Sequence, residues 1–82
     1  MLTTVPAGEY ANDVNLDPLS NLIFVTDGHG NQVLEVDGST NQVIATVPLS
    51  GSFPVGVAPN PVTRAVYITE FFSNQVEIMT ER

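Results

Sequence analysis

The chain has 82 residues, 43% of them hydrophobic, and its nine acidic and two basic side chains give a formal net charge of −7 at pH 7. This length fits one small domain, the lack of cysteine excludes disulfides and thiolate metal sites, and the acidic balance argues against nucleic acid and anionic membranes as partners. No apolar run approaches the roughly 20 residues of a membrane helix, and the first ten residues do not resemble a signal peptide.

Short strands separated by turns are expected along the whole chain. In chain order they cover residues 2–5, 12–17, 22–27, 32–37, 42–47, 55–60, 65–70 and 75–80. Asp-Gly and Asx-Pro pairs, which favour turns, lie between them, and no segment has a sustained helical period. The runs at 22–27 and 65–70 are almost continuously apolar, as in strands buried on both faces. The sequence therefore predicts an all-β fold.

The chain contains an internal repeat. The tripeptide Asn-Gln-Val occurs at 31–33, 41–43 and 74–76, and its first and last copies lie 43 residues apart (74 − 31). The same shift pairs Gly8 with Gly51, Val14 with Val57, Pro18 with Pro61 and Thr26 with Thr69. All-β repeats of about 40–45 residues are typical of four-stranded β-propeller blades. The middle copy fits the start of the next strand within the first blade.

The predicted architecture is two four-stranded antiparallel β-propeller blades within one unit, residues 1–82. Repeat 1 covers about 6–47 and repeat 2 about 48–82, with residues 1–5 as a closing strand. The strand order is permuted, D-ABCD-ABC, so the first strand of one copy would complete the last blade of the next. Two blades cannot bury both faces alone. We therefore expect a homo-oligomer, a trimer or tetramer, or neighbouring blades in a longer chain.

Residues 21–48 and 52–79 resemble YVTN-type β-propeller repeats and the related NHL type. The resemblance is carried by Phe-Val-Thr-Asp at 24–27, Asp-Gly-Ser-Thr-Asn at 37–41, Phe-Pro-Val-Gly-Val-Ala at 53–58, Asn-Pro at 60–61 and Tyr-Ile-Thr at 67–69. The chain departs from the pattern at Asp13, which aligns with Gly56, and at Met79-Thr80, which replaces an Ile-Asp ending. The resemblance implies a propeller fold and a secreted, periplasmic or cell-surface setting. It implies no particular ligand.

One face of the predicted fold collects the loops from fourth to first strands and from second to third strands. A binding site is expected on this loop face, because loops on a rigid scaffold carry function. The candidate contacts are Glu9, Tyr10, Asn12, Asp13, Asp27, His29, Phe53, Glu70, Phe71 and Phe72. The adjacent Phe71 and Phe72 predict a contact patch for a partner or a carbohydrate. The alternative is that one of these two rings packs between blades.

The sequence also contains candidate metal-binding and catalytic residues. Asp27, His29 and Asn31 alternate as in part of a calcium loop, but glycine stands at position 38, where the loop needs a bidentate glutamate. Asp13 and Asn15 would line a channel, and related propeller lactonases and lyases bind a divalent cation with such groups. Asp13, Asn15 and Asp27 are thus the metal candidates. His29 could act as a general base, although no motif places a nucleophile beside it.

The leading functional prediction is a non-catalytic propeller repeat module that acts as a binding scaffold through its loop face. It needs no cofactor, and calcium is the alternative. Two rival predictions are a fragment of a propeller enzyme, such as a lactonase or lyase acting on a small molecule, and a purely structural repeat that only self-assembles. One histidine, two arginines and no clear acid–base pair argue against the enzyme.

Overall fold

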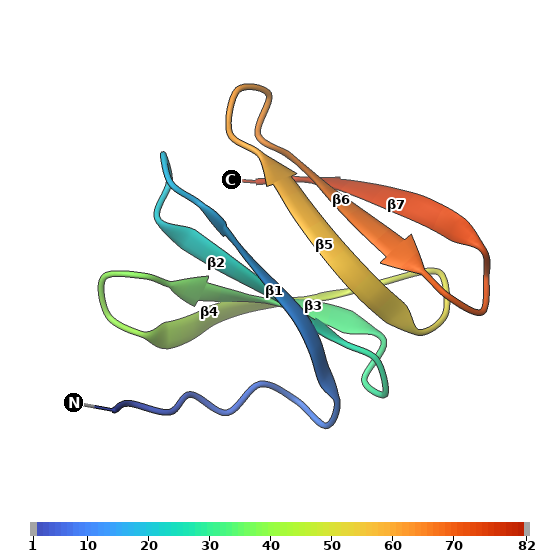
Figure 1. Ribbon diagram of the computed structural model, residues 1–82, viewed down its shortest axis with the longest axis horizontal. Coiled ribbons are helices and arrows are strands. Elements are labelled where there is room, and N and C mark those ends of the chain that lie inside the picture. The colour runs from blue at the N-terminus through green and yellow to red at the C-terminus, as the bar shows by residue number, and fades with distance from the viewer. Residues whose placement is uncertain (1, 82) are drawn as a thin grey trace.

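Seven antiparallel strands build the protein, and the computed structural model describes residues 2–81 (Figure 1). In chain order they are β1 (Ala11–Asp17), β2 (Leu22–Asp27), β3 (Gln32–Asp37), β4 (Gln42–Pro48), β5 (Pro54–Asn60), β6 (Ala65–Glu70) and β7 (Gln75–Thr80). No helix occurs among the described residues, so the predicted all-β class is confirmed. These seven strands start and end within one residue of the predicted positions.

The remaining predicted strand, at residues 2–5, pairs with no strand among the described residues. Its predicted partner is the last strand of another copy of the chain, and the structure describes one copy. Residue 1 of this closing segment and residue 82 of the second repeat lie outside the described residues. The closing role of the N-terminal segment therefore stays a prediction.

The strands form two separate sheets that each follow the order of the chain. β1 to β4 form the first sheet and β5 to β7 the second, and all neighbouring strands are antiparallel. Both inner strands are irregular near their starts, β1 between Ala11 and Val14 and β5 between Pro54 and Gly56. The first sheet has a fourth strand, whereas the outer edge of β7 pairs with no strand of the described chain.

Asparagine in the left-handed conformation precedes most strands and explains the recurring tripeptide. Asn21, Asn31, Asn41 and Asn74 have φ values of 59°, 54°, 60° and 54° and stand directly before β2, β3, β4 and β7. Asparagine adopts this conformation more readily than most residues other than glycine. Arg64, which stands directly before β6, has a φ of 65° and adopts the same left-handed conformation, although arginine does not favour it as asparagine does. Asn-Gln-Val thus marks a turn followed by the start of a strand, as predicted.

The two sheets pack face to face along their inner strands. β5 contacts β1 and β2, while the outer strands β3 and β4 diverge from β6 and β7 (Figure 1). The core between the sheets consists of Phe24, Val33, Val57, Val66 and Ile68. Burying a side chain of this size stabilises the fold by about 1.5–3 kcal/mol, so this shared core holds the sheets together.

The second sheet leaves one apolar face uncovered. The strands of the two sheets correspond at the 43-residue shift, since β2 begins at Leu22 and β6 at Ala65. Phe24 and Val33 of the first sheet are fully buried against the second sheet. Their counterparts on the free face of the second sheet, Tyr67 and Val76, are 38% and 55% exposed. The covered face of the first sheet thus corresponds to the uncovered face of the second.

Candidate functional site

Five aromatic rings form a continuous cluster at the loop face. The ring centroids of Tyr10 and His29 lie 4.8 Å apart, those of Tyr10 and Phe53 5.5 Å, and those of His29 and Phe53 6.0 Å. Phe72 lies 5.2 Å from Phe53 and 5.1 Å from Phe71. We call these five residues the aromatic cluster. The structure therefore brings together five of the predicted loop-face residues from both repeats.

The topology places all five rings at one end of the sheets. Tyr10 and Phe53 directly precede the inner strands β1 and β5, whereas His29 lies in the β2–β3 turn and Phe71 and Phe72 lie in the β6–β7 turn. Phe71 and Phe72 are 66% and 69% exposed and Tyr10 is 45% exposed. Within the single chain neither phenylalanine packs between the two sheets, and the alternative in which one of them packs between blades stays a prediction.

Backbone contacts hold the cluster in place. The amide of Gly28 donates to the carbonyl of Tyr10, and the amide of Phe71 donates to that of Phe53, both at 3.0 Å. A Cβ at position 28 would lie only 3.0 Å from the Phe53 ring and 3.3 Å from the Tyr10 ring. Glycine at this position therefore lets both rings lie directly on the β2–β3 turn.

Asn31 fixes the connection that carries Phe53. Its Nδ2 donates to the carbonyls of Leu49 (3.2 Å) and Gly51 (2.6 Å), and its Oδ1 accepts from the amide of Phe53 (3.2 Å). Phe53 itself has a φ of 61°, an unfavourable conformation for a bulky residue that costs about 1–3 kcal/mol. The surrounding hydrogen bonds hold this ring in place despite that cost.

Asp27 lies beneath the cluster and organises its backbone. The side chain is fully buried, and its carboxylate accepts hydrogen bonds from the amides of Glu9, Tyr10 and Gly30 and from Nε2 of Gln32. Burial opposes the charge, but these four donors outweigh it and lower the pKa of Asp27. Its oxygens face the protein's own donors, and a direct contact of Asp27 with a ligand stays a prediction.

Glu70 is the counterpart of Asp27 in the second sheet, and it too is buried instead of exposed on the loop face. Its Oε1 accepts from Ser73 Oγ and Gln75 Nε2, while its Oε2 is buried without a hydrogen-bond partner. Burial and, after it, the neighbouring Glu77 carboxylate raise the pKa of Glu70. The same neighbour relation lowers the pKa of Glu77. Of the two carboxyl groups, Glu70 is therefore the one that takes up a proton more readily.

Replacing Glu70 by glutamine tests whether the Glu70 carboxyl group is protonated in the folded chain. Glu70→Gln is expected to match or exceed the wild-type stability at pH 7, because an amide donates to Glu77 without needing a proton. The raised pKa means that the stabilisation of wild-type Glu70 is present below its unfolded value of 4.5 and is lost as the pH rises through the folded pKa. Urea denaturation at several pH values should show this loss in the wild type and not in the variant.

Glu77→Gln is the matched control for that substitution. Glu77 accepts from Ser50 Oγ at 2.9 Å and from the amide of Gly51 at 2.8 Å. An amide at position 77 satisfies these donors less well, so this variant is expected to lose about 1 kcal/mol of stability. A loss of that size in Glu70→Gln at pH 7 would contradict a protonated Glu70 in the folded chain.

The remaining sequence candidates link the two inner strands. Nδ2 of Asn12 donates to the carbonyl of Pro54 and Nδ2 of Asn15 to that of Val57, both at 3.1 Å. Asp13 Oδ2 accepts from the amide of Val57 at 3.1 Å. Asp13 and Asn15, two of the metal candidates, thus hold β1 against β5. Within residues 2–81 no three His, Cys, Asp or Glu side chains converge as a metal-binding group would require.

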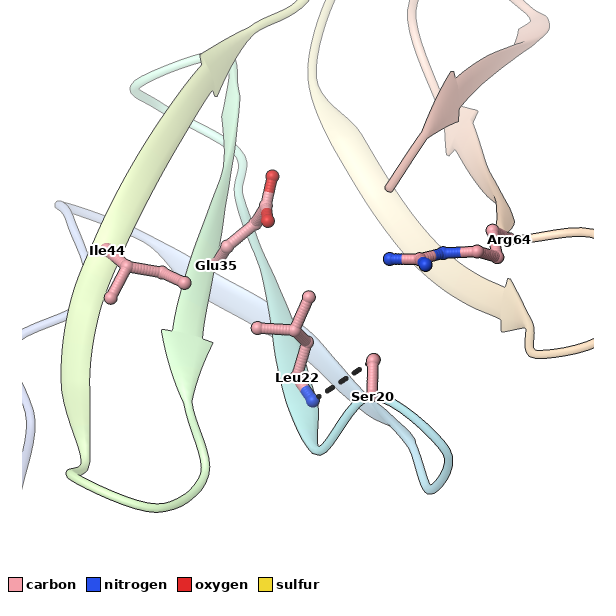
Figure 2. Close-up of a pocket in the computed structure, with 5 residues that line it drawn as sticks. All are labelled: Ser20, Leu22, Glu35, Ile44 and Arg64. Carbon is pink, nitrogen blue, oxygen red and sulfur yellow. Dashed lines mark hydrogen bonds between the residues drawn. The ribbon is translucent and has the colours of Figure 1, made fainter. Parts of the chain in front are cut away.

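Two charged features at the other end of the sheets escape the sequence analysis. Asp17 and Glu81 form a second buried carboxyl pair, in which burial and then Asp17 raise the pKa of Glu81. An open cavity of about 680 Å³ separates the diverging sheets and is lined by Ser20, Leu22, Glu35, Ile44 and Arg64 (Figure 2). Glu35 interrupts an apolar run at 33–36, which is the one sequence signal that could have revealed this cavity.

Comparisons with known proteins found no match, either among protein-family models or among curated proteins. In the part of the chain that the structure describes, no helix is long and apolar enough to cross a membrane.

Proposed function

We propose that this chain is a non-catalytic β-propeller repeat module that binds a partner through the aromatic cluster. The observation that carries the proposal is the exposure of the cluster. A cluster of aromatic rings exposed to water is energetically unfavourable, and such patches commonly mark a surface that a partner covers. Here Gly28, Asn31 and the strained backbone of Phe53 hold the rings at the surface. Such preorganisation lowers the entropy lost on binding.

Several observations support a description of the two sheets as propeller blades. Each is an antiparallel meander, the repeat length is 43 residues, and hydrogen bonds recur at that shift. The amide of Asn21 donates to Asp17, and that of Arg64 to Asn60. Gln32 Nε2 donates to Asp27, as Gln75 Nε2 donates to Glu70. A repeat that conserves both packing and turn chemistry is what stacked blades require.

The uncovered surfaces support assembly with further blades. Ile78 and Val76 on the free face of the second sheet are 64% and 55% exposed, and Val14 on the first sheet is 62% exposed. At the 43-residue shift Val14 corresponds to Val57, which is buried between the sheets. The first sheet (β1 to β4) of a neighbouring copy could therefore pack on the free face of β5 to β7. This contact would repeat the one that β5 to β7 make with β1 to β4 within a single chain. We propose this head-to-tail packing between copies of the chain.

The rival functions lack a comparable observation. His29 has the rings of Tyr10 and Phe53 as neighbours, a packing arrangement that a binding surface explains without a general base. A purely structural repeat would gain nothing from an aromatic cluster at the end of its sheets. The binding scaffold is the function that uses this feature.

Mapping of small-molecule binding by ¹H–¹⁵N NMR tests the proposed function. We expect sugars, amines and short peptides that bind to shift the amides of Gly28, His29, Phe71 and Phe72. Phe72→Ala should weaken such binding about fivefold or more, because aromatic residues dominate binding surfaces. Val62→Ala is the control, since Val62 is exposed in the β5–β6 turn at the opposite end. Ligands that shift only residues around Glu35 and Arg64 would overturn the proposal.

A further inference from the structure

Charge is unevenly distributed between the two ends of the sheets. The carboxyl groups at or near the loop end are Glu9, Asp13, Asp27, Glu70 and Glu77. The only basic side chain there, among the described residues, is His29 of the aromatic cluster. Arg64 lies in the β5–β6 turn at the opposite end. The aromatic cluster therefore stands in a field of negative charge with no arginine or lysine beside it.

We infer that the aromatic cluster binds an arginine side chain of a basic peptide segment. This inference rests on the proposed function and names the partner of the same site. A cation over the face of a tyrosine or phenylalanine is attracted by the negative face of the ring. The planar guanidinium of arginine also stacks on aromatic rings and is weakly hydrated, unlike the ammonium of lysine. Anionic ligands are repelled by the surrounding carboxylates.

The ring geometry favours a cationic guest. The Tyr10–Phe53 and Phe53–Phe72 pairs are each tilted by 56°, and the Phe71–Phe72 pair by 71°. Tilted rings present their faces in different directions, whereas a parallel stack would cover them. Glu9 stands directly before Tyr10 in an exposed position. Its carboxylate can approach a guanidinium that rests on the Tyr10 ring, because surface side chains move freely.

Asp27 adds a fixed charge beneath the cluster. Its carboxylate remains ionised because four donors surround it, and it is fully buried. A buried charge is screened less by salt than an exposed one. The negative field at the cluster thus persists even where exposed side chains such as Glu9 are screened.

A matched pair of peptides tests this inference by NMR titration. The first is Gly-Ser-Arg-Gly-Arg-Ser-Gly with blocked ends, and the second carries the neutral isostere citrulline at both arginine positions. We expect the arginine peptide to shift Tyr10, His29 and Phe72 and the citrulline peptide to bind about fivefold more weakly or worse, which corresponds to about 1 kcal/mol. Raising the salt from about 20 mM to about 300 mM should narrow that difference.

Protein variants complete the test. Phe72→Ala should weaken the arginine peptide about fivefold, while Leu19→Ala, an exposed position in the turn at the opposite end, should leave binding unchanged. Equal binding of the two peptides would overturn the preference for a cation and leave the aromatic binding site in place. Absence of binding by the arginine peptide at millimolar concentration would also overturn the inference, and the small-molecule map then decides separately whether the cluster binds anything.

Discussion

Asp27→Ala is expected to lower the free energy of unfolding by about 3 kcal/mol or more, since hydrogen bonds to a charged group each contribute about 1.5–3 kcal/mol. The substitution leaves the amides of Glu9, Tyr10 and Gly30 without their acceptor. It also opens a void beside Gly8, whose backbone lies against the Asp27 carboxylate. The same change should release Tyr10 from the aromatic cluster and weaken binding there.

Chemical denaturation at pH 7 measures this loss, with Asp27→Asn as the matched variant. Asparagine keeps one oxygen for Tyr10 and Gly30, but its amide group faces donors from Glu9 and Gln32. We therefore expect Asp27→Asn to be destabilised less than Asp27→Ala. If the two variants were equally destabilised, neither the volume nor the remaining oxygen of asparagine would contribute, and the charge of Asp27 alone would explain its role.

Acidification provides an independent check on Asp27. Because its pKa is lowered in the folded chain, its contribution is fully present above the unfolded value of 3.8 and disappears as the pH falls through the folded pKa. The difference in stability between the wild type and Asp27→Ala should therefore shrink below about pH 3.8. A difference that stayed constant into strong acid would contradict a role for the charge.

The strands and turns were predictable because their signals are local. Asparagine before a strand and Asx-Pro or Asp-Gly in a turn each act through the backbone of a few neighbouring residues. The amide of Val62 bonds to Asn60 Oδ1 just as that of Leu19 bonds to Asp17 Oδ1. Turn chemistry of this kind can be read from the order of residues, without knowledge of the packing.

The composition of the site was predictable only in part. Loop order indicates that Tyr10, Phe53 and Phe72 share a face, but their contacts depend on how the second sheet packs on the first. Burial of Asp27 and Glu70 has the same origin, because each lies at the end of a strand where the turn folds back over it. The proximity of Glu70 and Glu77 depends on the pairing of β6 with β7, which no local pattern reveals.

Two asparagines, Asn31 and Asn74, share a backbone conformation and differ in their surroundings. Asn31 and Asn74 both have a φ of 54°, but the side chain of Asn31 makes three hydrogen bonds, whereas that of Asn74 makes none among the described residues. Gly51, the strongest partner of Asn31, corresponds to Gly8 at the 43-residue shift. In head-to-tail packing, the Asn74 side chain would thus bind the carbonyl of Gly8 in a neighbouring copy, beside the unpaired edge of β7.

Glycine at either position keeps the left-handed backbone and removes only the side chain. Asn31→Gly is expected to lose about 2–3 kcal/mol, at about 1 kcal/mol per hydrogen bond, at every protein concentration. Asn74→Gly should leave the dilute chain unchanged and weaken its assembly, because the missing bond lies between copies. Native mass spectrometry should then show a discrete trimer or tetramer for the wild type that dissociates at higher concentration in Asn74→Gly. A wild-type chain that stays monomeric would overturn assembly between copies and leave neighbouring blades in a longer chain as the means of covering the exposed face.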